Sequence, residues 1–525
     1  MLGEMMRMPL IVSAALEFAG KYHAGAEIVS RTVEGPLHRY GYGDMANRAR
    51  KLANALGALG IGSGDIAGTL AWNGYRHVEI YYALSGIGAV CHTINPRLFT
   101  EQIVYIVEHA EDRYLFVDLT FVPLLEQIQD RLRKVKGVII LTDRATMPAT
   151  SLANPICYEE LIADHSDQID WPELDEYSAA ALCYTSGTTG NPKGVLYSHR
   201  STMLHALSLC LPDAFNLSAC EALMPVVPMF HVNAWGTPYA AAITGCKLVL
   251  PGPRLDGASL AELIRDEGVT VAAGVPTVWF NLLGHLDKSG ESLPSLARVV
   301  IGGSAAPPSM LEAFSERGIR PIHAWGMTEL SPLGVVNAPT RRTMSLPAAE
   351  KRALAAKQGR PLFGIDLKVN EDGVLKARGH WVCEGYFREG PCAAHDESGW
   401  FETGDVATID QDGFMQIVDR SKDLIKSGGE WISSIELENI AVAHPAVAEA
   451  AAIARKSEKW GERPIVIVTL KSGMTAEPRE LREFFRGKVG KAFEPDEVIV
   501  TDKLQHTATG KLLKVELRRI YGNAV

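Results

Sequence analysis

Residues 182–199, LCYTSGTTGNPKGVLYSH, combine the residue types that bind a polyphosphate. An apolar run ends in a stretch of Thr, Ser, Gly and Asn, and Pro192 and Lys193 follow it. Glycines let backbone N–H groups turn inward, hydroxyls add donors and the lysine adds positive charge. The spacing of a Walker A loop is absent, and a flexible Ser/Gly turn is the alternative. The residues expected to bind phosphate are Thr185, Ser186, Gly187, Thr188, Thr189, Gly190 and Lys193.

Three other segments place polar groups or bare backbone close to apolar runs. In AWGMTEL, the Glu329 carboxylate stands beside Thr328, and a hard cation prefers such oxygen ligands. In ETGDVA, Asp405 could bridge a vicinal diol, or it could be a turn aspartate. Gly302 and Gly303 follow the apolar run RVVI, where bare backbone could approach a flat ring or simply turn. A solvated surface carboxylate is the alternative for Glu329.

Alternating strands and helices must position these segments. Residues 45–60, MANRARKLANALGALG, place apolar side chains on one helical face and end at Gly60. The run DIAGTLAW then predicts a buried strand, and YRHVEIYYALSGIGA another helix. The same alternation continues to the run LARVVIGG. It predicts an α/β region of mostly parallel sheets with helices on both faces.

The pattern changes after Ile365. Short strands separated by Gly-Asp turns predict antiparallel hairpins and a small β subdomain. From 434 to the end, three segments predict helix, strand and helix in a small α+β unit. We expect an N-terminal region at 1–419 and a mobile C-terminal lid domain at 420–525. The stretch from Val369 to Val374 looks short, which predicts that a loop is missing there.

Composition excludes several classes of protein. Of 525 residues, 52 are Lys or Arg and 62 are Asp or Glu, so the net charge is −10, which argues against a general nucleic-acid binder. Hydrophobic residues at 47% exclude a disordered chain. No uninterrupted apolar stretch reaches about 18 residues, so we expect no membrane span. Eight scattered cysteines without a CxxC pair, and no secretory signal, predict a cytoplasmic protein.

Ordered motifs along nearly the whole chain resemble the adenylate-forming superfamily of acyl-CoA synthetases, adenylation domains and luciferases. They are TSGTTGNPK, PMFHVNAWG, GGSAAP, WGMTE, GDVATID, VDRSKDLIKSGGEWIS and TATGKLLK. The resemblance implies ATP, Mg²⁺ and coenzyme A as cofactor and cosubstrates. It implies that Glu329 holds Mg²⁺, with Thr185, and that Asp405 and Arg420 bind the ribose. The adenine segments are Gly302, Gly303, Ser304, Ala305, Trp325, Gly326, Met327 and Thr328.

The same resemblance assigns roles near the C-terminus. Lys511 in TATGKLLK would stabilise negative charge where a carboxylate attacks the α-phosphate. Lys422, two residues after Arg420, would be a hinge about which the lid domain rotates between half-reactions. The second pose would bring a loop to the pantetheine tunnel. The members of that loop are Lys426, Gly428, Gly429, Glu430 and Trp431.

The acid substrate is predicted from PMFHVNAWG. His231 and Trp235 are four residues apart, on one face if the segment is helical, and line the acyl pocket in the family together with Gly302. A large indole favours a short or medium acid. Trp235 could instead be a core residue or a movable gate, and His231 a structural histidine. Residues 70–98 look most like bacterial medium-chain acyl-CoA ligases, including those for 3-(methylthio)propionate.

The sequence therefore predicts an ATP-dependent acid–CoA ligase that forms an acyl-AMP intermediate. The rivals are an aryl-acid CoA ligase, a carrier-protein-loading adenylation enzyme, a luciferase-type oxygenase and a catalytically silent nucleotide-binding relative. The expected partners are a small carboxylic acid, ATP and coenzyme A, with no nucleic acid. The resemblance to this family also implies a homodimer.

Overall fold

Seven strands of the first sheet come from the apolar runs between residues 66 and 198. The computed structural model describes all residues except 2, 186–190, 392–393, 429, 507–511 and 524–525. The spatial order is β7-β6-β5-β3-β4-β8-β9, parallel except for the β8–β9 pair. The strands are β3 (Ile66–Leu70), β4 (Val90–Thr93), β5 (Tyr114–Val117), β6 (Gly137–Ile140), β7 (Pro155–Cys157), β8 (Ala179–Tyr184) and β9 (Gly194–Ser198).

A second, nine-stranded sheet has the order β16-β15-β14-β13-β12-β10-β11-β1-β2. It is parallel from β14 to β1 and antiparallel at both edges. Its strands are β1 (Glu27–Arg31), β2 (Leu37–Gly41), β10 (Ala222–Pro225), β11 (Lys247–Leu250), β12 (Val271–Gly274), β13 (Arg298–Ile301), β14 (Arg320–Gly326), β15 (Leu333–Val336) and β16 (Arg360–Pro361).

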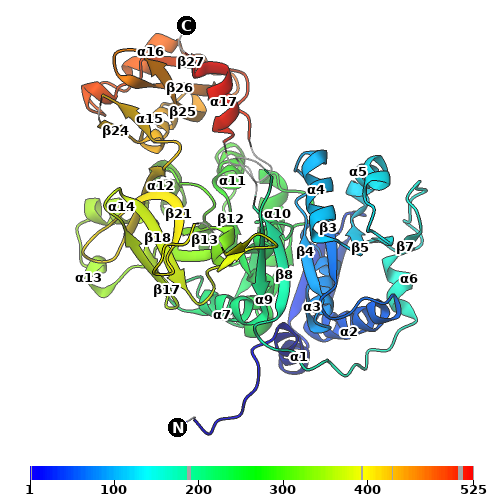
Figure 1. Cartoon of the computed structure of the whole chain (residues 1–525). Coiled ribbons are helices and arrows are strands. Elements are labelled where there is room, and N and C mark those ends of the chain that lie inside the picture. The colour runs from blue at the N-terminus through cyan, green and yellow to red at the C-terminus, as the bar shows by residue number, and fades with distance from the viewer. Residues whose placement is uncertain (2, 186–190, 392–393, 429, 507–511, 524–525) are drawn as a thin grey trace.

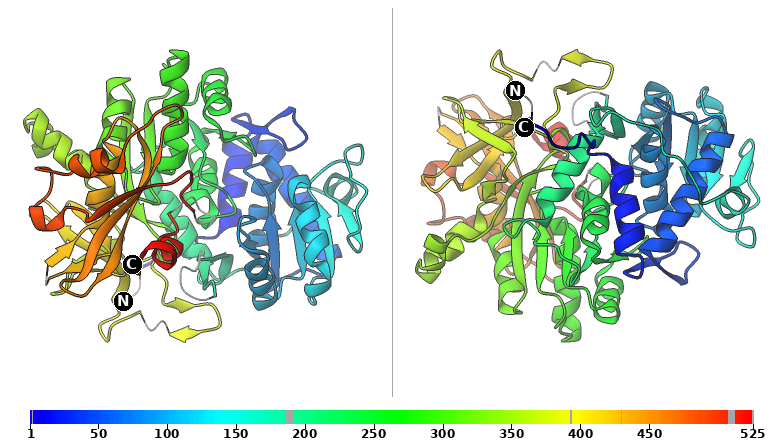
Figure 2. Two further views of the ribbon diagram at one scale, coloured as in Figure 1. Left: turned by 90° about the horizontal axis from the view of Figure 1, so that it is seen from above. Right: turned by 90° about the horizontal axis from the view of Figure 1, so that it is seen from below.

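Helices cover both faces of each sheet, as the strand–helix alternation predicted. One core contains residues of both sheets and of the helices between them, and the two sheets lie side by side in Figure 2. The shared helices are α1 (Val12–Tyr22), α2 (Tyr42–Ala58), α3 (Tyr75–Gly86), α6 (Tyr158–Ala163), α7 (His199–Cys210) and α9 (Thr237–Thr244). The outer helices are α4 (Thr100–Ala110), α5 (Val122–Ile128), α10 (Gly257–Glu267), α11 (Pro276–Ser289) and α12 (Pro308–Glu316). Two further helices are α13 (Arg341–Met344) and α14 (Ala348–Ala356).

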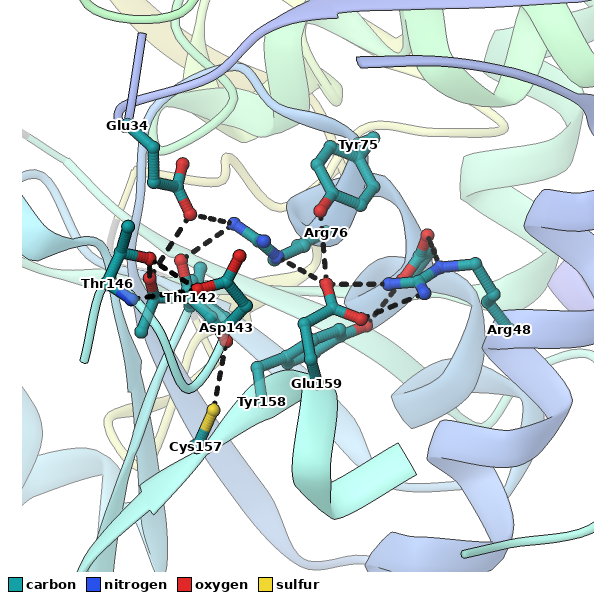
Figure 3. Close-up of polar contacts among 12 residues, drawn as sticks. Glu34, Arg48, Tyr75, Arg76, Thr142, Asp143, Thr146, Cys157, Tyr158 and Glu159 are labelled. Atoms are coloured by element: carbon teal, nitrogen blue, oxygen red, sulfur yellow. Dashed lines mark hydrogen bonds and ion pairs between the residues drawn. The ribbon is translucent and has the colours of Figure 1, made fainter. Parts of the chain in front are cut away.

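A buried ion-pair network joins the helices that cover the first sheet (Figure 3). Arg48 on α2 pairs with Glu79 on α3 over 2.8 Å and with Glu159 on α6 over 2.9 Å. Arg76 pairs with Glu159 over 2.8 Å and with Glu34 over 2.7 Å. Burial opposes ionisation of Glu159, but hydrogen bonds and charge from Arg48 and Arg76 outweigh it and lower its pKa. The network therefore links α2, α3 and α6 through charged side chains, although Glu34 Oε2 is buried without a hydrogen-bond partner among the described residues.

The small β subdomain is a four-stranded antiparallel sheet of order β17-β18-β21-β22 with a separate β19–β20 hairpin. Its strands are β17 (Ile365–Val369), β18 (Val374–Gly379), β19 (Gly385–Tyr386), β20 (Gly390–Pro391), β21 (Phe401–Ile409) and β22 (Met415–Arg420). The prediction of a missing loop is wrong, because β17 and β18 form a continuous hairpin. Asn370 Oδ1 accepts from Val374 N over 2.8 Å and Gly373 has φ +78°, so four residues close the turn.

The C-terminal part lies above the rest of the chain in Figure 1. It contains a five-stranded sheet, with β27 parallel to β26 and the other pairs antiparallel. Its elements are β23 (Ile425–Ser427), β24 (Glu430–Ile432), α15 (Ser434–Val442), β25 (Val447–Ser457), β26 (Gly461–Leu470), α16 (Pro478–Glu483), β27 (Glu497–Val500) and α17 (Lys514–Tyr521). Residues 447–456, the second half of the first C-terminal segment that we expected to be helical, lie instead in strand β25. In the described part of the chain, no helix has the length and apolar character that a bilayer crossing requires.

Candidate active site

A cleft of about 1050 Å³ lies where the carboxyl ends of strands from both sheets meet the small β subdomain and the C-terminal part. Ligands commonly bind at this edge of an open parallel sheet, because strand-end loops converge there. The predicted site residues on its walls are Thr185, Lys193, His231, Trp235, Gly302, Gly303, Ser304, Ala305, Trp325, Gly326, Met327, Thr328, Glu329, Asp405, Arg420 and Lys422.

The predicted phosphate loop leaves the first sheet at the end of β8 and returns in β9. Thr185 and Lys193 close its base, since Thr185 N donates to Lys193 O over 2.9 Å and Lys193 N donates to Thr185 Oγ1 over 3.2 Å. The Lys193 ammonium lies 3.2 Å from Glu389 and 4.5 Å from the ring centre of Tyr386. The residues Ser186, Gly187, Thr188, Thr189 and Gly190 lie outside the described part of the chain.

Glu329 lies in a one-turn 3-10 helix after β14, and the residue is 7% exposed. The Tyr386 hydroxyl donates to Glu329 Oε1 over 2.9 Å. The Tyr197 hydroxyl donates to Thr328 O over 2.6 Å, which ties this turn to β9. A carboxylate and the Thr185 hydroxyl on one cleft are oxygen ligands of the kind that Mg²⁺ takes alongside phosphates and water. The donor set therefore fits the predicted metal.

Bare backbone lines the part of the cleft predicted to take adenine. A Cβ on Gly302 would lie 3.1 Å from the Trp235 indole and 3.2 Å from Ala324 O, so a side chain would crowd both. A Cβ on Gly326 would overlap Pro332 O. Both glycines line the cleft, and neither position has room for a side chain.

Asp405 joins the small β subdomain to β14. Its Oδ1 lies 2.6 Å from Arg420 Nε, and its Oδ2 accepts from Trp325 Nε1 over 2.8 Å. The Asp405 side chain is 3% exposed. Each carboxylate oxygen has a further lone pair, so Asp405 can still accept from a hydroxyl at the cleft.

The end of β10 and the start of the acyl segment PMFHVNAWG (228–236) are held by Asn73, which lies between β3 and α3. Asn73 Nδ2 donates to Pro225 O and Val227 O, each over 2.8 Å, and Asn73 Oδ1 accepts from Met229 N over 2.7 Å. Asn73 is 3% exposed, and its amide makes all three contacts at the start of α3. The segment beyond His231 is not a right-handed helix, since residues 232–235 all have positive φ.

The chain around Lys422 connects β22 to the C-terminal part. Partial burial lowers the pKa of the Lys422 ammonium, although Asp423 opposes this. Ser421 N donates to Gly404 O over 2.9 Å, and Asp423 pairs with Arg518 on α17. Lys422 lines the cleft, as do residues 512–515. Lys511 lies outside the described part of the chain.

The loop predicted to meet pantetheine is away from the cleft in this structure. Lys426, Gly428, Glu430 and Trp431 belong to the β23–β24 hairpin and do not line the cleft. The Lys426 ammonium lies 4.9 Å from the ring centre of Trp431, which is 49% exposed. Gly429 lies outside the described residues.

Three side chains important to the geometry were not predicted. Tyr386 touches both Glu329 and Lys193, Tyr197 holds the Thr328 turn, and Asn73 holds the acyl segment. Each of these hydrogen bonds joins two residues that are at least 57 positions apart in the sequence. No local motif marks them, apart from the position of Asn73 directly before a predicted helix.

Comparisons with known proteins cover the whole chain. The AMP-binding enzyme family model matches residues 17–387, and the model of the AMP-binding enzyme C-terminal domain matches 436–511. A medium-chain-fatty-acid–CoA ligase from Ectopseudomonas oleovorans is 50% identical over 536 residues, covering 100% of this chain and 98% of its own. A 3-methylmercaptopropionyl-CoA ligase from Ruegeria lacuscaerulensis is 50% identical over 538 residues, covering 100% of both.

Solved structures include o-succinylbenzoate CoA synthetase (MenE) from Bacillus subtilis. Its complex with the acyl-adenylate OSB-AMP superposes with a TM-score of 0.79 at 25% identity, covering 98% of this chain and 99% of MenE. The same enzyme is known in complex with ATP and magnesium ion. The α/β architecture with a smaller C-terminal part is thereby confirmed.

Proposed function

Because the chain belongs to the AMP-binding enzyme family and is an acyl-CoA synthetase, we propose that it activates a short or medium-chain acid in two steps. In the first, a carboxylate oxygen attacks the α-phosphorus of ATP and the bond to pyrophosphate breaks. In the second, the thiol of coenzyme A attacks the acyl carbon, loses its proton, and AMP leaves with the bonding electrons. The convergence of Thr185, Glu329, Asp405 and Trp235 on one cleft carries this proposal.

Roles in the first step follow from the chemistry of the cleft walls. Asp405 accepts from the ribose hydroxyls, and the bare backbone at Gly302 and Gly326 admits the adenine ring. Glu329 and Thr185 would hold Mg²⁺, which neutralises phosphate charge. Lys511 provides the positive group for the attack, and mutational losses of such groups are commonly about 10²–10³ in kcat.

The acid is proposed to be short or medium in length, with 3-(methylthio)propionate as a candidate. Trp235 supports this, because its indole lies against Gly302 on the wall of the cleft and occupies volume there. The two relatives at 50% identity, one for medium-chain fatty acids and one named for 3-methylmercaptopropionate, support the same range. Methylene discrimination in apolar pockets is modest, about 1–3 kcal/mol per group, so several acids should react.

We propose that the large region spans 1–419 and the lid domain 420–525, with the hinge at Lys422. The turn after β22 supports this boundary, as does the gap between the two family models. Rotation would bring Lys426 to Trp431 to the cleft for thioester formation. In a Lys422→Pro variant, pyrophosphate release should persist while thioester formation falls; unimpaired thioester formation would contradict the hinge.

We also propose that the protein is a homodimer in the cytoplasm. The seven cysteines that the structure describes are all free thiols, which suits a reducing compartment. Sedimentation of the purified chain tests the dimer.

The proposed activity is tested with a panel of straight-chain, thioether and aromatic acids. Each is supplied with ATP and Mg²⁺, with and without coenzyme A, and assayed for pyrophosphate and thioester. We expect both products with short and medium acids, and loss of pyrophosphate in Lys511→Ala. Pyrophosphate without thioester would indicate plain adenylation, and preference for benzoates would indicate an aryl-acid ligase.

A further inference from the structure

Four consecutive residues without a glycine adopt the left-handed backbone conformation beside the cleft. The φ angles are 41° at Val232, 51° at Asn233, 49° at Ala234 and 57° at Trp235. L-residues visit this region as single residues rather than in runs, and a β-branched residue such as Val232 is an outlier there. Such strain persists only where the surrounding structure over-determines it, and it clusters at functional sites. The question is what holds this left-handed turn (232–235) in place.

The side chain of Asn233 tethers the left-handed turn to the first sheet. Its Oδ1 accepts from Thr93 Oγ1 and from Cys183 Sγ, each over 3.4 Å. Thr93 and Cys183 are paired residues of the neighbouring strands β4 and β8, and their own side chains lie 3.2 Å apart. All three residues are at most 3% exposed. A buried amide oxygen with two donors on a rigid sheet is a fixed anchor point, because leaving it unpaired is costly.

Residue type singles out the same position. Asparagine enters the left-handed region far more readily than valine, alanine or tryptophan, because its short polar side chain can bond locally. Asn233 is therefore the one member of the turn suited to its conformation, and its side chain is also the tether. Other contacts of the turn include Gly236 N, which donates to Asn233 O over 3.0 Å, and the Thr237 hydroxyl, which donates to Ala234 O over 2.6 Å. The backbone N–H groups of Val232 and Asn233 also hydrogen-bond the Cys183 side chain.

The turn decides where the Trp235 indole lies. Trp235 is 8% exposed, lines the cleft, and approaches Gly302 so closely that a Cβ there would be 3.1 Å from the ring. A right-handed or extended backbone at 233 and 234 would carry the indole elsewhere. Its place against Gly302 thus depends on Asn233 staying anchored.

We propose that Asn233 is a positioning residue that sets the acid length, by anchoring the left-handed turn on Thr93 and Cys183 and so holding Trp235 against Gly302. The proposal rests on the proposed acid–CoA ligase function. Asn233 need not touch the acid; it acts through the indole. Releasing the anchor lets the indole leave Gly302, which lengthens the space for the acyl chain, while Glu329 and Asp405 keep their own contacts at the phosphate and ribose end of the cleft.

The test compares kcat/KM for butyrate, hexanoate, octanoate and decanoate, with KM for ATP and the melting temperature. Asn233→Gly keeps a residue that tolerates positive φ and removes only the tether. We expect the decanoate-to-butyrate ratio of kcat/KM to rise about tenfold or more, with KM for ATP within about twofold of the parent value. Thr93→Val with Cys183→Ala, which removes both donors and keeps Asn233, should shift the ratio in the same way.

Combining all three substitutions should add little, because they break one tether. Asn216→Gly is the matched control, since Asn216 also has positive φ, at 54°, but is exposed and does not line the cleft. It should leave the ratio unchanged. A lower melting temperature with an unchanged ratio, or fully additive effects, would overturn the proposal.

If Asn233→Gly does not fold, the donor variants decide alone, and an unchanged ratio in them overturns the proposal equally. Failure of the underlying function looks different. In that case the parent protein itself activates no acid of the series, whereas failure of the Asn233 proposal leaves an active enzyme whose selectivity does not respond.

Discussion

Lys514 Nζ lies 2.7 Å from Glu438 Oε1, and this pair fastens α17 to α15 at the wall of the cleft. Burial disfavours the charged form of Lys514, but the negative charges of Glu438, Asp419 and Asp423 together outweigh it and raise the lysine pKa. Burial also raises the pKa of Glu438. Lys514 is three residues after Lys511, the proposed catalytic residue. The ion pair therefore anchors the chain shortly after that position.

Lys514→Met should destabilise the C-terminal part by about 3 kcal/mol, because it leaves the buried Glu438 carboxylate unpaired. Adding Glu438→Gln should recover much of that loss. Urea denaturation measures both effects. Equal stability of the single and double variants would contradict a pairwise role.

Tyr386→Phe should raise the Mg²⁺ concentration for half-maximal pyrophosphate release about tenfold, since a hydrogen bond to a carboxylate is worth about 1.5–3 kcal/mol. The lost bond is the one to Glu329 Oε1. A Mg²⁺ titration at saturating ATP is the measurement. Tyr177→Phe, at a 70% exposed position, is the control and should leave the titration unchanged.

Asn73→Asp preserves shape but replaces the two N–H donors to Pro225 O and Val227 O with a carboxylate oxygen. Each buried carbonyl left unpaired costs about 1–3 kcal/mol. We therefore expect kcat/KM for the acid to fall at least tenfold and KM for ATP to stay unchanged. Asn54→Asp is the matched control. Asn54 Nδ2 also donates to two carbonyls, those of Ser166 and Gln168, but away from the cleft. Equal effects of the two variants on the acid would refute positioning by Asn73.

Asp118 should make stability depend on pH. Burial raises the pKa of this carboxyl from 3.8 to about 7, although Trp72 N donates to its Oδ2 over 2.6 Å. A raised folded-state pKa contributes stability below the unfolded value of 3.8, and that contribution is lost as the pH rises through about 7. The full loss is on the order of 4 kcal/mol, since one pKa unit is worth about 1.4 kcal/mol.

Asp118→Asn removes that titration and keeps an acceptor for Trp72 N. The variant should match the parent chain near pH 4 and exceed its unfolding free energy near pH 8. Urea midpoints at several pH values between these limits provide the measurement. A constant difference between variant and parent would show that Asp118 does not titrate in this range.

Periodic segments were the most predictable part of the fold. The helix expected at 45–60 is α2, with Ala49, Leu52 and Leu56 fully buried, because one apolar face per turn requires a helix. The alanine-rich run after Val447 was not predictable in this way. Alanine favours helix, but Ala450 and Ala452 pack on one side of β25 and Ala451 on the other, so burial on both faces outweighs propensity.

The segments that meet at the cleft were identified from residue type and order, whereas their partners were not. Gly302, Glu329 and Asp405 each stand in a recognisable motif. Tyr386 and Asn73 act through contacts that exist only once the sheets are packed. The left-handed turn was also beyond prediction, because Asn233 is its one residue with a preference for that conformation.

The acyl segment follows β10 of the second sheet, yet Thr93 and Cys183, which anchor it, are in strands of the first sheet, and Asn73 follows strand β3 of that sheet. Substitutions in that half of the molecule can therefore change which acid is preferred without changing the residues that face ATP. Descendants of one ancestral gene could diverge onto new acids through substitutions that a comparison of pocket-lining residues alone would overlook.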